Sequence, residues 1–242
     1  MNYEIIKNDL FDYPNRYIFQ LKDAFKFSLD SLLLAEFLNI NKNTNNILDL
    51  CTGNGAIPLV LSEYTKASIV GFEIQKEIYD LAIKSVNYNK LDNQIKIIND
   101  DINNIKEYYS FNFFDIIVCN PPFFKIHDNA NLNKNDMLSI ARHELKIDLD
   151  SIFDIVKNYL QENGTFYMVH RPDRLDEIII GAYKKKLIIK EIQLIITKKD
   201  NAPSIALFKI KKHGKPGIKM PRIIDISEYS TYQNMFKEAI WN

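Results

Sequence analysis

The residues with the clearest chemical potential form the tetrapeptide Asn120-Pro121-Pro122-Phe123. It follows an almost purely apolar run over residues 113–119, which predicts a buried parallel strand. Two prolines at the tip of a strand end its hydrogen-bond ladder, and Pro121 restricts Asn120 to extended backbone. The segment therefore predicts a rigid turn at the carboxyl edge of a sheet, where open α/β sheets bind ligands. Amide and carbonyl oxygens held beside an aromatic ring suit a planar substrate that carries an NH2 group.

A second candidate site is the segment DLCTGNG, residues 49–55, which joins a short apolar strand over 46–51 to a helix that begins at 56. Its glycines Gly53 and Gly55 permit a positive φ and let the backbone approach a ligand closely. The dinucleotide fingerprint G-x-G-x-x-G would need a glycine where this chain has Pro58, and no phosphate loop of the form G-x-x-x-x-G-K-[ST] occurs. The pattern D-x-x-x-G-x-G therefore favours a nucleotide-like ligand without a pyrophosphate.

Two further apolar strands end in carboxylates. The segment SIVGFE ends at Glu73, whose carboxylate could accept both hydroxyls of a ribose. The segment IKIINDDI contains Asp100 and Asp101, either of which could accept a hydrogen bond from an adenine amine. We favour Asp101, because the apolar Ile102 follows it and begins a new element. Any one acid alone is more simply a helix N-cap or a loop end, but four strand-end signals at βα spacing are hard to produce by chance.

Taken together, these motifs resemble class I S-adenosylmethionine-dependent methyltransferases that modify an exocyclic or amide nitrogen. More narrowly, the chain resembles the bacterial tRNA1(Val) (adenine-37-N6)-methyltransferase family, which acts on the adenine just 3′ of the anticodon. Four stretches carry the narrower resemblance: FSLDSLLLA (27–35), DLCTGNG (49–55), NPPF (120–123) and VHRPDRL (169–175). The resemblance implies S-adenosylmethionine as cofactor and tRNA as partner.

The resemblance also implies roles for individual residues. The lone pair of an adenine N6 amine is delocalised into the ring, so the enzyme would accept hydrogen bonds from both amine hydrogens, through the Asn120 side-chain oxygen and the Pro121 carbonyl. Pro122 would fix the turn, and Phe123 would stack on a base that has left its own stack. Cys51 stands where many class I enzymes have a glycine. The cofactor-binding residues implied are Phe27, Ser28, Asp30, Asp49, Cys51, Gly53, Gly55, Glu73, Asp101 and Asn120.

The charge of the chain is unevenly spread although its net value is zero. Residues 171–242 carry 15 Lys and Arg against 8 Asp and Glu, whereas residues 1–170 carry 16 against 23. Such asymmetry indicates a polyanion partner, and lysine runs are equally typical of a solvated surface. We expect the loop 124–136 to close over the flipped base. The candidate RNA-binding residues are Arg142, His143, Arg171, Arg174, Lys198 and Lys199.

Length and composition predict one domain over residues 1–242, with an N-terminal hairpin and helix (1–40), a cofactor-binding core (41–212) and an irregular C-terminal arm (213–242). The chain has two cysteines in apolar runs, no zinc motif, no secretory signal and no long apolar span. We therefore expect a cytoplasmic monomer that uses neither a metal nor a membrane.

The order of elements argues for a doubly wound α/β sheet, and the resemblance implies the seven-stranded Rossmann-like class I arrangement with its last strand antiparallel. The expected elements are a hairpin over 3–20, helices near 29–40, 56–65, 76–90, 149–161 and 173–183, and strands near 46–51, 68–73, 94–98, 113–119, 164–170, 186–197 and 204–211.

Three alternatives share part of this pattern. Enzymes that methylate glutamine amides of release factors use the same NPP-aromatic turn, but they resemble a fold with a sizeable N-terminal helical domain, and only 48 residues precede Asp49. DNA adenine methyltransferases usually add a target-recognition domain, which a chain of 242 residues scarcely accommodates. A dinucleotide oxidoreductase or a non-catalytic binding module belongs to a different class, and Pro58 together with the complete NPPF counts against it.

Overall fold

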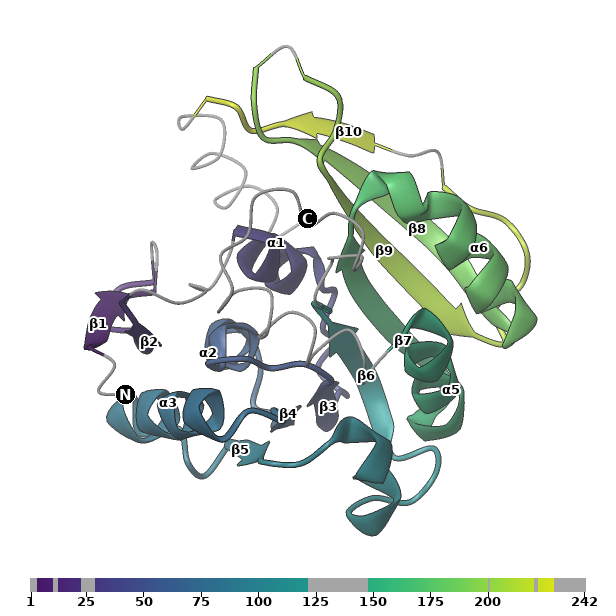
Figure 1. Cartoon of the computed structure of the whole chain (residues 1–242). Helices are drawn as coiled ribbons and strands as arrows, with labels where there is room; N and C mark the ends of the chain where they lie inside the picture. Colours follow the sequence, from purple (N-terminus) through teal and green to yellow (C-terminus); the bar gives the residue numbers. More distant parts are fainter. Residues whose placement is uncertain are drawn as a thin grey trace.

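A computed structural model describes residues 4–10, 13–22, 29–121, 148–199, 201–219 and 222–228. Its elements are the strands β1 (Ile5–Asp9) and β2 (Tyr17–Leu21), the helix α1 (Leu29–Phe37), β3 (Asn46–Asp49), α2 (Ala56–Leu61), β4 (Ser68–Phe72), α3 (Lys76–Tyr88), β5 (Ile95–Ile98), the 3₁₀ helix η1 (Ile102–Glu107), β6 (Phe114–Cys119), α5 (Leu149–Tyr159), β7 (Leu160–His170), the 3₁₀ helix η3 (Pro172–Arg174), α6 (Leu175–Lys184), β8 (Leu187–Ile196), β9 (Ile205–Lys212) and β10 (Arg222–Asp225). The predicted elements lie in the predicted order, and η1, η3 and β10 are additional to them (Figure 1).

The main sheet has the strand order β10-β8-β9-β7-β6-β3-β4-β5. Its strands run parallel to one another except β9, which is antiparallel to both β7 and β8. Seven of these strands form the arrangement expected from the resemblance, with the seventh, β9, antiparallel. The eighth, β10, pairs in parallel with β8 and lies within the segment expected to be an irregular arm. A four-residue strand flanked by loop formers has too short a pattern for the sequence to separate from a loop.

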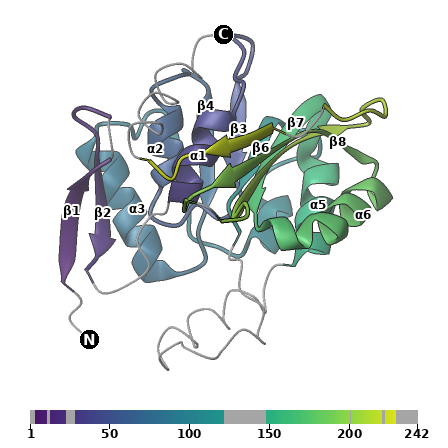
Figure 2. The same cartoon turned by 90° about the horizontal axis from the view of Figure 1, so that it is seen from above.

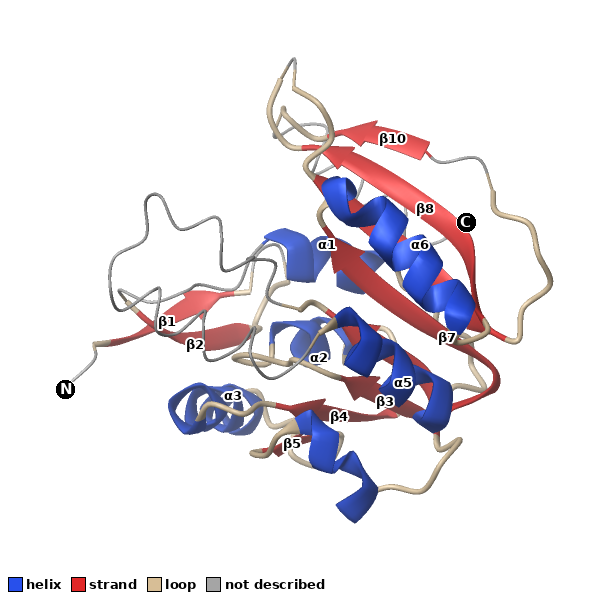
Figure 3. Ribbon diagram, turned by 45° about the vertical axis from the view of Figure 1, so that its right-hand side comes forward, coloured by secondary structure: helices blue, strands red, loops and turns tan. Residues whose placement is uncertain are grey.

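Helices cover both faces of the sheet, as a doubly wound fold requires. Helices α1, α2 and α3 enclose one apolar core, which includes Ile47, Val118 and Tyr167. Helices α5 and α6 enclose the other, which includes Leu48 and Ile117 (Figure 3). Successive residues of β3 and β6 thus point into opposite cores, which explains why their sequences are apolar throughout.

The N-terminal hairpin β1–β2 lies along α3, at the end of the molecule away from β8 and β10 (Figures 1 and 2). The backbone N–H of Phe19 donates to Ser85 Oγ at 3.0 Å, and that of Tyr17 donates to Asn89 Oδ1 at 3.0 Å. Strand β7 begins at Leu160, four residues before the predicted start, because Leu160 already pairs with Phe114 of β6. Within the described ranges, no helix is both long and apolar enough to cross a bilayer.

Candidate active site

The turn between β3 and α2 is fixed by backbone hydrogen bonds to both neighbouring strands. Leu50 N–H donates to the Val118 carbonyl of β6 at 3.0 Å, and Thr52 N–H donates to the Phe72 carbonyl of β4 at 2.9 Å. Gly53 and Gly55 have φ values of 55° and 88°, which lie in the left-handed region that glycine adopts without steric cost. The two glycines of the DLCTGNG segment therefore have the conformational role that the sequence predicts.

Gly71 of β4 is a contributor to this turn that sequence reasoning missed. A Cβ on Gly71 would lie 2.7 Å from Thr52 Oγ1 and 2.8 Å from Thr52 Cβ. Strand β4 therefore needs a glycine at this position, because the Thr52 side chain packs against its backbone. A glycine inside an apolar strand pattern is the sequence signal for such a close approach.

Two carboxylates are buried beside the turn. Asp49 is fully buried, and neither of its oxygens has a hydrogen-bond partner within the described part of the chain. Glu73 is 5% exposed and accepts hydrogen bonds from Gly53 N–H at 3.1 Å and Gln75 N–H at 2.8 Å. Burial raises the pKa of each carboxyl to about 7, and the neighbouring Glu73 charge adds to the rise at Asp49. Two such groups would gain from a ligand that donates hydrogen bonds or carries positive charge.

The acids after β5 have different local roles. Asp101 caps η1, because its Oδ1 accepts from Asn103 N–H at 2.9 Å and from Asn103 Nδ2 at 2.9 Å, which leaves Oδ2 outside these two bonds. Asp100 accepts from Asn104 Nδ2 at 2.8 Å and from Tyr108 Oη at 2.8 Å, and these hydrogen bonds lower its pKa. The predicted new element does begin at Ile102. Asp101 keeps one carboxylate oxygen for a ligand, whereas both oxygens of Asp100 are engaged.

Asn120 follows β6 directly, so it lies one strand away from the glycine turn at the same edge of the sheet. Its Nδ2 donates to Ser31 Oγ of α1 at 2.8 Å. This bond uses the donor end of the amide and leaves Oδ1 as an acceptor. Pro121 is buried. Pro122 and Phe123, the other two predicted catalytic residues, lie outside the described residues.

Ser31 was not among the predicted site residues. Its place in the first turn of α1 gave no signal, because a serine in a helix commonly bonds its own backbone or faces solvent. Asp30, which was predicted, is the neighbouring residue in α1, and burial raises its pKa. Phe27 and Ser28 lie outside the described residues.

Cys51 and Cys119 lie beside the buried carboxylates. Both are free thiols, Cys51 partly exposed on the turn and Cys119 fully buried at the end of β6. Burial raises the pKa of Cys119 well above its ordinary value, and the adjacent Cys51 thiol adds to the rise.

The arginines after β7 pair with nearby acids. Arg171 Nη2 lies 2.6 Å from Asp173 Oδ2, and Arg174 pairs with Glu177 one turn along α6. Arg171 follows the carboxyl end of β7, so it lies at the same sheet edge as Asn120. An exposed ion pair of this kind contributes little to stability, and its arginine can exchange the carboxylate for a phosphate.

Lys198 and Lys199 are exposed in the turn after β8, which runs parallel to β7 and ends at the same edge of the sheet. Arg142, His143 and the loop 124–136 lie outside the described residues. Within the described residues, no group of three or more His, Cys, Asp or Glu side chains could hold a metal ion.

The edge of the sheet thus combines a glycine turn, two buried carboxylates and a fixed amide on adjacent parallel strands, in the fold of class I methyltransferases. The family model for the methyltransferase small domain matches residues 26–148, and the chain belongs to this family.

Relatives and solved structures agree with this class. The chain is 26% identical over 233 residues to the tRNA1(Val) (adenine(37)-N6)-methyltransferase of Bacteroides thetaiotaomicron, covering 96% of this chain and 95% of that protein. It is 23% identical to the protein of the same name from Actinobacillus pleuropneumoniae serotype 5b, with 96% and 95% covered. A predicted O-methyltransferase from Agrobacterium tumefaciens superposes with a TM-score of 0.65 at 15% identity, over 88% of this chain and 97% of that one. TYW2 of M. jannaschii in complex with AdoMet gives 0.55 at 14% identity, with 88% of each chain covered.

Proposed function

We propose that this protein transfers a methyl group from S-adenosylmethionine to the exocyclic N6 amine of an adenine in tRNA, namely adenine 37 of tRNA(Val). The observation that carries the proposal is the pairing of the glycine turn with Asn120, whose amide nitrogen is tied to Ser31 and whose oxygen remains an acceptor. The names of the curated relatives, which match over nearly the whole chain, support the choice of tRNA and of position 37.

The residues around the turn fit S-adenosylmethionine. Glu73, at the end of β4, suits the ribose hydroxyls, because its oxygens now accept only backbone N–H groups. The free oxygen of Asp101 suits an adenine amine. Asp49 keeps two buried oxygens without partners among the described residues, next to a turn in which no atom lies within 4 Å of the place that a Cβ on Gly53 would occupy. When bound, the cofactor supplies an electrophilic methyl group on a positively charged sulfur.

The protein's contribution to the transfer is positioning. The Asn120 side-chain oxygen and the Pro121 carbonyl each accept a hydrogen bond from the target amine. Two acceptors favour a pyramidal nitrogen whose lone pair points away from the ring, toward the methyl group. Holding the two reacting atoms in line accounts for a barrier reduction of several kcal/mol, on the order of 7–11 kcal/mol for well-oriented groups. The proton passes to solvent water after methylation has made the nitrogen acidic.

The test supplies labelled methyl donor to the protein with tRNA(Val) transcript, a transcript in which adenine 37 is replaced by guanine, duplex DNA and release factor in parallel. Digestion to nucleosides is expected to yield labelled N6-methyladenosine from the first transcript alone. Label in the release factor would support the glutamine N5-methyltransferase alternative instead. Thermal-shift measurements with S-adenosylhomocysteine and with NAD distinguish these two kinds of methyltransferase from a dinucleotide enzyme, because each class is stabilised by its own cofactor type.

The residue-level test is Asn120→Ala, which removes one of the two acceptors. By analogy with the loss of one oxyanion-hole donor, turnover is expected to fall roughly 10²-fold or more, with little change in cofactor affinity. Near-normal turnover by this variant would refute the role given to Asn120.

A further inference from the structure

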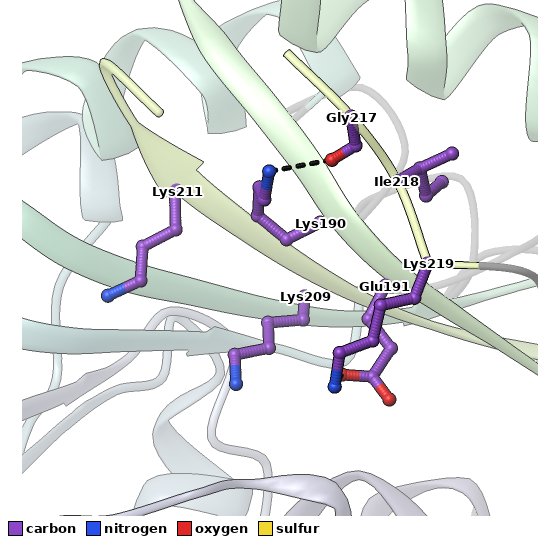
Figure 4. Close-up of a pocket in the computed structure, with 7 residues that line it drawn as sticks. All are labelled: Lys190, Glu191, Lys209, Lys211, Gly217, Ile218 and Lys219. Atoms are coloured by element: carbon purple, nitrogen blue, oxygen red, sulfur yellow. Dashed lines mark hydrogen bonds and ion pairs between the residues drawn. The ribbon is translucent and has the colours of Figure 1, made fainter. Parts of the chain in front are cut away.

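An open groove of about 430 Å³ lies on the sheet where β8 and β9 run side by side, and none of its lining residues belongs to the loops that follow β3 and β6. The segment after β9 forms its outer wall, because Lys219 N–H donates to the Lys190 carbonyl of β8 at 3.0 Å. Figure 4 shows the side chains that line it: Lys190, Glu191, Lys209, Lys211, Ile218 and Lys219, together with Gly217.

The groove is strongly cationic, with four lysines and one glutamate in its lining. Two of the lysines have local partners. Lys190 Nζ donates to the carbonyls of Lys215 and Gly217 at 2.9 and 2.6 Å, which holds the outer wall in place. Lys219 Nζ lies 3.4 Å from Glu191 Oε2, so the one carboxylate of the groove is already engaged.

The other two lysines, Lys209 and Lys211, have no carboxylate partner within the described ranges. They are alternate residues of β9, so both point from the same face of the sheet (Figure 4). Lys209 Nζ lies 5.9 Å from the ring centre of Tyr167, and Lys211 Nζ donates to the Asn163 carbonyl at 2.7 Å. Partial burial and the charge of Lys209 lower the pKa of Lys211. Two like charges crowded on one face would be stabilised by an anion between them.

Strand register connects the groove to the candidate active site. Lys209 pairs with Tyr167, Tyr167 pairs with Val118, and Val118 pairs with Asp49, so these four residues form one row across β9, β7, β6 and β3. Paired residues point to the same face, here the face that α1 covers. Three strand spacings separate the ends of the row, on the order of 15 Å between Cα atoms. A macromolecular substrate can span that distance, whereas a single nucleotide cannot.

We propose that this groove binds the phosphate backbone of the RNA substrate through Lys209 and Lys211 while the target base occupies the active site. The inference rests on the proposed function, and it assigns RNA contact to residues that the sequence motifs did not indicate. Alternate strand residues lie about 7 Å apart, a separation close to the repeat of phosphates along a nucleic-acid strand. Lysines contact phosphates as point charges, so the groove contributes affinity and orientation but no base specificity.

The test compares the double variant Lys209→Gln/Lys211→Gln with wild type. Glutamine keeps much of the aliphatic stem and removes the charge. The matched control is Lys157→Gln/Lys184→Gln, which removes two exposed lysines from α5 and α6 on the opposite face. Binding of fluorescent tRNA(Val) transcript is measured against salt concentration, and methylation of the same transcript is measured for KM and kcat.

The groove variant is expected to bind tRNA about tenfold more weakly, with a salt slope reduced by about 2, one for each lost phosphate contact. Its KM for tRNA rises accordingly, while kcat at saturating tRNA and affinity for S-adenosylhomocysteine stay at wild-type values. The control variant is expected to match wild type in all five quantities.

Failure of this inference is distinguishable from failure of the proposed function. Equal tRNA affinity and salt slope for the groove variant and wild type would overturn the groove assignment even if methylation proceeds. Wild-type protein that binds tRNA through the groove but transfers no methyl to it would overturn the proposed function and leave the groove standing. An equal loss of tRNA affinity in the control and groove variants would show that the lysines act only through the general charge of the surface, and it would also overturn the assignment.

Discussion

Nucleoside-cofactor binding by this protein is expected to depend steeply on pH near neutrality. The cause is the pair of buried carboxyls beside the glycine turn, because burial raises the pKa of both Asp49 and Glu73 to about 7. A ribose hydroxyl donates its hydrogen to the ligand-binding carboxyl, so that group must be ionised to bind. A pKa raised to about 7 means that Glu73 is largely protonated at lower pH, and cofactor affinity therefore rises as the pH rises through the pKa.

The size of the effect follows from the pKa. For one carboxyl that must ionise with a pKa of about 7, the apparent dissociation constant at about pH 6 is roughly tenfold higher than at about pH 8, equivalent to about 1.4 kcal/mol. If Asp49 must ionise as well, the ratio approaches about 100-fold. Carboxyls with ordinary pKa values would remain ionised over this whole pH range, so the dissociation constant of the cofactor would not change.

Titration calorimetry with S-adenosylhomocysteine at a series of pH values measures the affinity directly. Repeating it in buffers with different ionisation enthalpies counts the protons released on binding. The control is Glu73→Gln, which is expected to bind more weakly at about pH 8 and to show a flatter pH profile. An affinity that is constant across this range in the wild type, with no proton release, would refute the assignment of these carboxyls to the cofactor.

Three substitutions test the supporting structure. Ser31→Ala removes the acceptor that fixes the Asn120 amide, and kcat is expected to fall about tenfold with unchanged affinity for S-adenosylhomocysteine; an unchanged kcat would contradict this role. Gly71→Ala places a Cβ 2.7 Å from Thr52 Oγ1, so unfolding free energy is expected to fall by about 1–3 kcal/mol in urea denaturation. Tyr64→Phe removes the hydroxyl that joins a glutamate of α1 to a tyrosine of the N-terminal hairpin, at a cost of about 1–3 kcal/mol in the same measurement.

The parts of the fold that depend on local patterns could be predicted from the sequence. Apolar runs identified β3, β4, β5 and β6 within a few residues, alternating patterns identified β8 and β9, and the β1–β2 hairpin followed from the turn dipeptide Pro14-Asn15. The positive φ at Gly53 and Gly55 followed from the turn pattern, because only glycine adopts that region freely.

The parts that depend on pairing between distant segments could not be predicted. Ser31 contacts Asn120 across 89 residues, a contact that neither local pattern encodes. Lys209 and Lys211 belong to an alternating strand whose sequence does not say which neighbour covers its polar face. The sequence offers a helix cap and a ligand as alternative roles for Asp101, and only the folded 3₁₀ turn after β5 shows that the cap uses one carboxylate oxygen and leaves the other.

Cys51, the partly exposed thiol on the glycine turn, can report ligand binding through its reaction with an alkylating reagent. Cys119 stays protonated in the interior, where burial holds its pKa high, so an alkylating reagent added to the folded protein meets Cys51 first. If Cys51 contacts the cofactor, as the family resemblance implies, a bound cofactor is expected to shield that sulfur. The rate of alkylation, read by mass spectrometry, thus records how much of the protein holds a ligand, without any introduced label.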